Sequence, residues 1–360
     1  MLNLLKKISI LIAIILGLSI LGSLILPYGW ADAVQYAKIQ HYKSVKGKYN
    51  ALFFGGSLEY RQVNPKIVDG VLNSNQIHFN SYNLGIDGHN IIQQLADIDG
   101  IMKIKNDSIK YIFVSMSSEP YFFAYNKNTS KWLAWVDLKS TVNSIFILPN
   151  AGRTLKEKTR FIILYIRSYF MNLFKVGMVP DVLTHYLGQD TLYQAYIGPD
   201  KNGFFAYDDE RTYLAQYNRG LDEDLNTSRA RFIQDMHYRD SLRNANTQQF
   251  SNYKVTDKPN QEQVNMLYRF MKKYNKMGID VYFILPPRAM TSYSYLLPIF
   301  YALPENRRIE LADPRQYPQF YTYENGYNFH HLNKKGAAIF SKILGNKIAD
   351  LLMTSSKIPE

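Results

Sequence analysis

The sequence predicts an α/β protein with three layers, αβα, in which helices cover both faces of a parallel, doubly wound sheet. Apolar runs of strand length alternate with segments of helical period, which is the βαβ pattern. The strands are apolar without interruption, as expected of strands that are buried on both faces. With 360 residues, 46% of them hydrophobic, the chain is long enough to bury a large core. Ligands of such sheets bind at the carboxyl ends of the strands.

Five strands and four of their flanking helices can be placed from the pattern. The strands are expected at residues 50–54, 78–83, 109–116, 279–285 and 308–312. Helices are expected to begin near Asn64, His89, Gln261 and Asn333. About 160 residues separate the third strand from the fourth, too many for a simple crossover. We therefore expect an insertion at about 120–260 that contains its own helices and acts as a lid or subdomain.

One helix of this insertion is expected within residues 159–174. Its apolar side chains are interrupted by Arg160 and Arg167, which lie two turns apart on one face. The segment is too short and too charged to span a bilayer. Two interpretations stay open: a helix buried in the lid, or an interfacial helix that lies against the membrane or a membrane partner.

The N-terminus predicts a membrane anchor over residues 1–30. Residues 8–27 carry no charge, and about 20 such residues span a bilayer as a helix. Two lysines precede the run, and Tyr28 and Trp30 follow it. Because lysines stay on the cytoplasmic side, we expect a single-pass protein of a bacterial-type cell membrane, with a cytoplasmic N-terminus and an extracytoplasmic main domain.

A cleaved signal peptide is the alternative, since Gly29 and Ala31 suit a small-residue cleavage site. The apolar run is longer than the usual signal-peptide core, which favours a retained anchor. Residues 31–48 are basic and are expected to be a linker to a main domain at 49–360.

The composition excludes several kinds of site. The chain has no cysteine, which excludes thiol catalysis, thiolate zinc sites and disulfides. The adjacent His330 and His331 point in different directions, so we predict no metal site, and no other cofactor. A net charge of +12 on an exported domain fits anionic lipid headgroups or envelope polymers better than nucleic acid.

A serine and a histidine are the candidates for chemistry. The first strand runs into Gly55, Gly56 and Ser57, and a serine at this sheet edge, near a helix N-terminus, is placed to be a nucleophile. The same Gly-Gly-Ser is also a common turn with an N-cap. A histidine just before the C-terminal helix, in the run that contains His330 and His331, can reach back over the sheet and act as its general base.

Three blocks of sequence resemble the SGNH (GDSL-type) hydrolase superfamily: GGSLEYRQVNP, YNLGIDGHN and NFHHLNKKGAAIFSKIL. The resemblance is closest to the membrane-anchored branch of that superfamily. This branch includes the D-alanyl-transfer protein of teichoic acid modification and the polysaccharide O-acetyltransferases that work beside membrane-bound O-acyltransferases. The resemblance implies a flavodoxin-like sheet and serine acyl chemistry.

By position, the resemblance implies a role for four residues. Ser57 matches the nucleophile and His331 the general base, and the N–H groups of Ser57 and Gly88 match the oxyanion hole. The family's acid stands three residues before the histidine, where this chain has Asn328. An asparagine carbonyl can orient the imidazole but does not stabilise its charged form.

Other residues are possible substitutes at the two positions where the chain departs from the family. Asp313 and Glu324 are alternative carboxylates for the histidine, although each is an ordinary turn or surface residue. The family often has an oxyanion-hole asparagine after the third strand, and Ser117 or Ser118 stands there in this chain.

Three charged residues are possible substrate contacts. Glu59 and Arg61 could pair with each other or bind a polar acyl donor or sugar, and a solvent-facing ion pair is the alternative. Arg288, directly after two prolines at the end of the fourth strand, could bind an anionic group of the substrate.

The resulting expectation is an extracytoplasmic, membrane-anchored serine acyltransferase or esterase. It would O-acylate, for example O-acetylate, a cell-envelope or extracellular polysaccharide, with the acyl donor delivered by a membrane-bound O-acyltransferase. Two alternatives remain: a catalytically impaired scaffold that binds glycan or such a partner, and a plain ester hydrolase.

Overall fold

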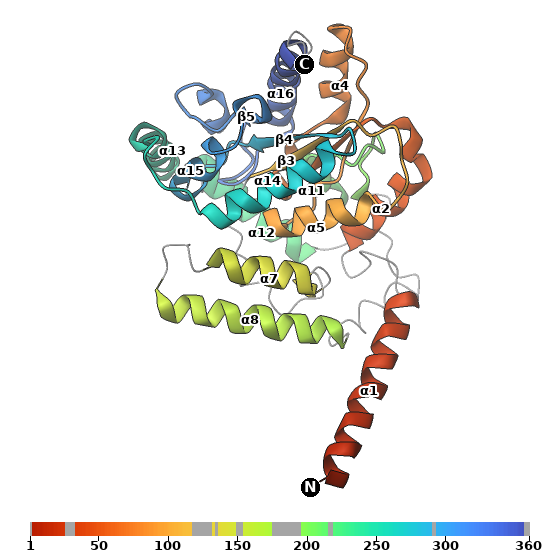
Figure 1. Cartoon of the computed structure of the whole chain (residues 1–360). Coiled ribbons are helices and arrows are strands. Elements are labelled where there is room, and N and C mark those ends of the chain that lie inside the picture. The colour runs from red at the N-terminus through yellow and green to blue at the C-terminus, as the bar shows by residue number, and fades with distance from the viewer. Residues whose placement is uncertain are drawn as a thin grey trace.

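The computed structural model describes residues 2–25, 33–116, 132–133, 136–148, 154–174, 196–214, 219–289 and 293–355. Within them, five strands form one parallel sheet in the order β2-β1-β3-β4-β5, as shown in Figure 1. The strands are β1 (Ala51–Phe54), β2 (Ser81–Asn83), β3 (Tyr111–Ser115), β4 (Asp280–Leu285) and β5 (Arg308–Glu310), each within or at the edge of a predicted range. The strand order reverses between β1 and β3, where the carboxyl ends of such sheets bind ligands.

Alternate strand residues pack into separate cores on the two faces of the sheet. In β1, Leu52 and Phe54 belong to one buried cluster and Ala51 and Phe53 to the other. The first cluster is covered by α5 (Ile91–Ile101), α14 (Gln261–Asn275) and α15 (Tyr293–Tyr301), and the second by α4 (Pro65–Ser74) and α16 (Lys334–Ser355). The predicted αβα layering with helices on both faces is therefore confirmed.

Local sequence signals explain where the flanking helices begin. The Asn64 side chain caps α4, with Pro65 at the first helical position, and Asn90 forms a capping box with Gln93 at α5. Each of the four predicted helix starts lies within two residues of the observed one.

Residues 33–45, which we expected to belong to a linker, instead form helix α2 (Ala33–Val45), followed by the short 3₁₀ helix η1 (Lys46–Lys48). Ala37, Lys38, Ile39 and Tyr42 of α2 are buried against the main body. The sequence pattern did not indicate this packed helix, because one of its buried positions is a lysine whose hydrogen-bond partner, Gly85, lies 47 residues further along the chain.

Helix α1 (Leu2–Ile25) precedes α2 and extends away from the body in Figure 1. Its segment Asn3–Leu21 has a mean hydropathy of 2.3 and is almost entirely exposed. Among the described residues it is the one helix whose length and composition would allow it to cross a membrane, a test that a signal sequence also passes.

Five helices before α14 are described between β3 and β4. They are α7 (Leu138–Ile147), α8 (Leu155–Leu173), α11 (Tyr207–Leu214), α12 (Arg219–Gln234) and α13 (Met236–Asn252). The predicted helix at 159–174 corresponds to α8. Figure 1 shows α7 and α8 as a pair lying across one side of the body, beneath α5 and α14.

Candidate active site

Ser57, His331 and Asn328 form a hydrogen-bonded chain at the carboxyl end of β1. His331 Nε2 lies 2.8 Å from Ser57 Oγ, and His331 Nδ1 lies 3.1 Å from Asn328 Oδ1. Because the amide oxygen can only accept, Nδ1 carries the proton and Nε2 is left to accept from the serine hydroxyl. This is the arrangement of a nucleophile, its general base and an orienting group.

The turn before Ser57 requires glycine. Ser57 is the first residue of helix α3 (Ser57–Gln62), and Gly56 is its N-cap. A Cβ on Gly55 would lie 2.0 Å from Glu59 Oε2, so a larger residue there would have to displace the buried Glu59 side chain. The carbonyl of Gly55 accepts the N–H of Ile86 at 3.0 Å, which joins this turn to the loop after β2. The two short loops therefore support each other at the nucleophile.

The Asn328 side chain organises the loop that carries the histidine. Its Oδ1 accepts the backbone N–H groups of His330 and His331, both at 2.9 Å, in addition to the imidazole. Of the alternative acids, Asp313 is bound through both oxygens by Arg315, and Glu324 is exposed. Asn328 therefore occupies the position at His331 Nδ1 that a carboxylate would take.

The surroundings of His331 favour its neutral form. Burial, followed by the neighbouring His330 and the Arg288 guanidinium, lowers the pKa of His331 well below its ordinary value. Burial and then Arg288 also lower the pKa of His330 to about 4. At neutral pH the imidazole is therefore an acceptor, as a general base must be.

Arg288 reaches the site by donating hydrogen bonds to His330, the neighbour of His331. Its Nε and Nη2 are 3.1 and 2.9 Å from His330 Nδ1. The structure thus places the Arg288 guanidinium beside the loop that carries His331, and its role toward an anionic substrate group stays a prediction.

Tyr207, which sequence reasoning missed, packs on the imidazole of His331. It begins α11, and its ring centroid lies 4.7 Å from that of His331. Burial raises the pKa of Tyr207 to about 12, so its hydroxyl stays protonated. The sequence did offer one signal that this segment packs on the body, namely the aromatic pair Phe204-Phe205 just before Tyr207. Both phenylalanines are buried in the structure.

Arg61 and Glu59 do not pair with each other. Arg61 Nη2 lies 2.7 Å from both Asp87 and Glu210, and its guanidinium packs on the Tyr60 ring at 3.9 Å. Residues two apart on a helix face different directions, and here both side chains are buried. The alternative of a solvent-facing ion pair between Glu59 and Arg61 is therefore wrong: Arg61 joins α3 to the loop after β2 and to α11.

Glu59 lies beneath the nucleophile turn without a charged partner. It is 1% exposed, and its two carboxyl oxygens make no hydrogen bond within the described residues. Burial raises its pKa to about 7, while the Ser115 hydroxyl, outside hydrogen-bond geometry, acts in the opposite direction.

The loop after β2 carries the predicted oxyanion glycine. Gly88 has a φ of 76°, a backbone conformation that favours glycine. Lys38 of α2 donates to the carbonyl of Gly85 at 2.6 Å and is itself fully buried. Sequence reasoning missed Lys38 because it placed this residue in a linker. Ser117 and Ser118 lie outside the described residues.

In the described part of the chain, no group of three or more His, Asp or Glu side chains is arranged to hold a metal ion. No protein-family model matches this chain, and none of the curated proteins matches it in sequence. The site's function is therefore inferred from its geometry.

Proposed function

We propose that this protein is a membrane-anchored serine acyltransferase or esterase of the SGNH type, which acts through an acyl-enzyme on Ser57. The observation that carries the proposal is the 2.8 Å contact between His331 Nε2 and Ser57 Oγ, with Asn328 on the other ring nitrogen. The parallel sheet in the order β2-β1-β3-β4-β5 and the position of Ser57 directly after β1 support it.

The reaction has two balanced steps. Ser57 Oγ attacks the carbonyl carbon of an acyl ester while His331 takes the serine proton, and collapse of the oxyanion expels the donor alcohol, which takes that proton from His331. A hydroxyl of the acceptor then attacks the acyl-enzyme, gives its proton to His331, and Ser57 regains a proton as the product leaves. The N–H groups of Ser57 and Gly88 are the proposed donors to both oxyanions.

The proposed acceptor is a cell-envelope or extracellular polysaccharide, and the acyl group is small, such as acetyl. An anchor at α1 would keep the site beside a membrane-bound O-acyltransferase that delivers the donor to the outer face. The net charge of +12 and Arg288 suit an anionic polymer. Water in place of the sugar hydroxyl would make the same site an esterase.

The test is intact-protein mass spectrometry of the full chain in detergent after exposure to a small activated acyl ester. We expect a mass increase of one acyl group, which is lost in Ser57→Ala and in His331→Ala and retained in Ser74→Ala, an exposed serine on α4. An adduct that survives Ser57→Ala would show that the nucleophile is a different residue.

Asn328 favours one other function, a scaffold that binds glycan or an acyltransferase partner without turnover. The scaffold function would be favoured if no acyl adduct formed even with a donor-competent membrane partner present, while the protein still bound glycan. The hydrogen bond between Ser57 and His331 is a feature that such a scaffold would not need.

A further inference from the structure

Helix α8 presents a stripe of exposed apolar side chains. Leu155, Ile163, Ile166 and Phe170 are 80, 60, 41 and 50% exposed. At about 100° per residue they fall on one side of the helix. The opposite side, with Leu164, packs into the body. One side of α8 is therefore buried, and the other is apolar without protein against it among the described residues.

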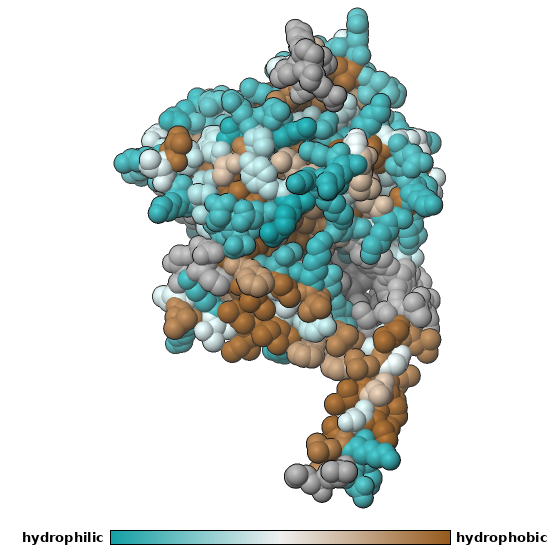
Figure 2. All heavy atoms as spheres, viewed as in Figure 1, coloured by the Kyte–Doolittle hydropathy of each residue, from teal (hydrophilic) through white to brown (hydrophobic). Residues whose placement is uncertain are grey.

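Helix α7 carries a similar stripe beside it. Leu138, Val142 and Phe146, spaced by four residues, are 60, 39 and 63% exposed. Figure 2 shows hydrophobic surface gathered over α7 and α8, whereas the body above is mostly hydrophilic. Contiguous apolar surface of this kind marks a site of interaction with a protein or a membrane.

Cations border the apolar stripe of α8. Helical geometry places Lys156, Arg160 and Arg167 together along one edge of the stripe, and Arg160 and Arg167 are exposed. Their long side chains can reach past the apolar residues to phosphate groups. An apolar face with a basic border is the pattern of a helix that lies in the headgroup region of a bilayer containing acidic lipids.

The position of the pair relative to α1 agrees with a membrane. Figure 1 shows α7 and α8 on the side of the body from which α1 extends, with α8 lying across the direction of α1. A helix that crosses a bilayer and a helix that lies on its surface have this relation.

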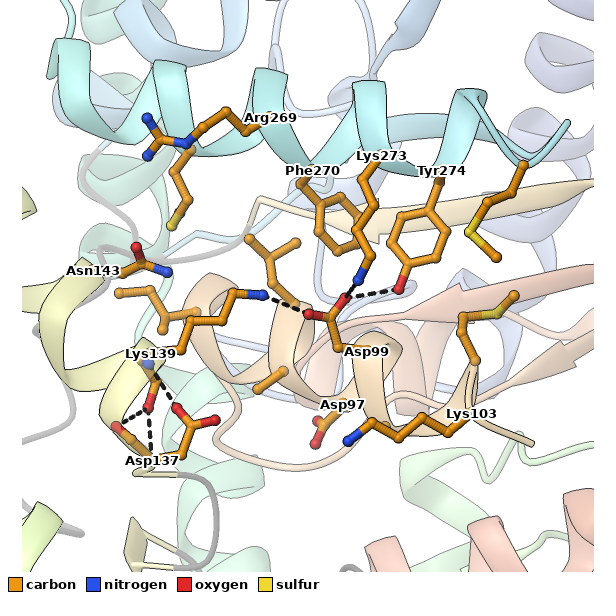
Figure 3. A pocket seen from close by; sticks show the side chains of 18 of the residues that line it. Asp97, Asp99, Lys103, Asp137, Lys139, Asn143, Arg269, Phe270, Lys273 and Tyr274 are labelled. Atoms are coloured by element: carbon orange, nitrogen blue, oxygen red, sulfur yellow. Dashed lines mark hydrogen bonds and ion pairs between the residues drawn. The ribbon is translucent and has the colours of Figure 1, made fainter. Parts of the chain in front are cut away.

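The helix pair also packs on the body, since Ile147 of α7 and Leu164 of α8 belong to its main buried cluster. Asp99 of α5 accepts from Lys139 of α7 and from Lys273 and Tyr274 of α14, at 2.6, 2.6 and 2.7 Å. Figure 3 shows these side chains meeting at Asp99 in a cavity of about 780 Å³ between the three helices. An attachment of α7 and α8 to a membrane would therefore set the orientation of the sheet.

We propose that α7 and α8 rest on the surface of the bilayer that α1 crosses, with their apolar stripes among the acyl chains and Lys156, Arg160 and Arg167 at acidic lipid phosphates. This inference concerns the placement of the domain and holds whether or not Ser57 is a nucleophile.

The absence of cysteine allows a direct test on the full chain in lipid nanodiscs. Ile163→Cys carries a fluorophore, and lipids with a spin label in the upper acyl chain quench it. The matched control is Val255→Cys, an exposed apolar position at 92% exposure outside the helix pair. We expect quenching at position 163 to exceed that at position 255 by about threefold or more in discs with acidic lipid.

Equal quenching at the two positions would overturn the proposal. Protection of the probe at position 163 from a water-soluble quencher, without quenching by lipid, would instead show that a second copy covers the face. The double change Arg160→Gln and Arg167→Gln tests the charges: we expect reduced lipid quenching in acidic discs, and unchanged quenching would refute their role.

Discussion

Arg61, four residues after the candidate nucleophile, forms a buried ion pair with Glu210, 149 residues further along the chain, at 2.7 Å. Arg61 is on α3 and Glu210 is on α11, so the pair joins the nucleophile helix to the segment that carries Tyr207. Tyr207 in turn packs on His331. The site is thus covered by a segment that the sheet alone does not position.

This link predicts the effect of Glu210→Gln. The change removes one of the two carboxylates that contact Arg61 and leaves Asp87 as the remaining one, so we expect a loss of about 1–3 kcal/mol in the free energy of unfolding and reduced acylation of Ser57. Asp209→Asn, which breaks an exposed pair with Lys334, should change stability by less than about 1 kcal/mol. Thermal unfolding in detergent measures both, and equal effects would contradict the prediction.

The amide at position 328 predicts a gain from Asn328→Asp. A carboxylate at His331 Nδ1 would stabilise the imidazolium, raise the pKa of His331, and increase turnover by about tenfold or more. Because protonated His331 is no base, the acid limb of kcat/KM should move to higher pH. Asn75→Asp, at an exposed position directly after the end of α4, is the control. An acid limb that stays in place would show that Asn328 does not face the catalytic ring.

Gly88 predicts a separation of stability from activity. With φ at 76°, Gly88→Ala should cost about 1–2 kcal/mol in backbone strain and lower the acylation rate about a hundredfold by displacing an oxyanion donor. The control is Gly278, which has nearly the same backbone conformation as Gly88, with φ at 74°, and open space around it. Gly278→Ala should show the strain alone, as a shift in Tm at an unchanged rate.

Glu59 predicts a pH-dependent gain in stability. Its pKa rises from 4.5 in the unfolded chain to about 7 when folded, so the protein binds this proton more tightly than the unfolded chain does. The folded protein is therefore most stable, as far as Glu59 is concerned, below about pH 4.5, where this carboxyl is protonated in both states. This stability is lost as the pH rises through 7 and the buried carboxyl has to ionise. Glu59→Gln should therefore stabilise by up to about 3 kcal/mol at pH 8 and by little at pH 5. Tm at the two pH values tests this, with the exposed Glu305→Gln as control.

Lys38 predicts that α2 supports the active site. Lys38→Met removes the buried donor to the carbonyl of Gly85, and we expect a loss of about 1–3 kcal/mol and slower acylation of Ser57. Lys43→Met, exposed on the same helix, should leave both unchanged. An unaltered acylation rate in Lys38→Met would mean that the loop after β2 holds its shape without α2.

Much of the scaffold could be predicted because its signals are local. Apolar runs located the five strands, and Asn64 and Asn90 marked helix starts through caps that involve only residues two or three positions away. The position of Ser57 after the first strand and of a histidine before the C-terminal helix predicted that the two would meet at one sheet edge. The choice of His331, with Asn328 beside it, came from the family resemblance.

The remaining features depend on contacts between distant segments. No local pattern indicates that Arg61 would choose Asp87 and Glu210 over Glu59, or that Lys38 would be buried at Gly85. Lys38 and Arg61 are buried because the completed fold supplies partners for their charges, and Gly85, Asp87 and Glu210 lie 47, 26 and 149 residues away from them along the chain. The amino-acid sequence by itself thus determined the sheet, its flanking helices and the serine and histidine at its edge, while tertiary packing decided which buried charges hold that edge in place.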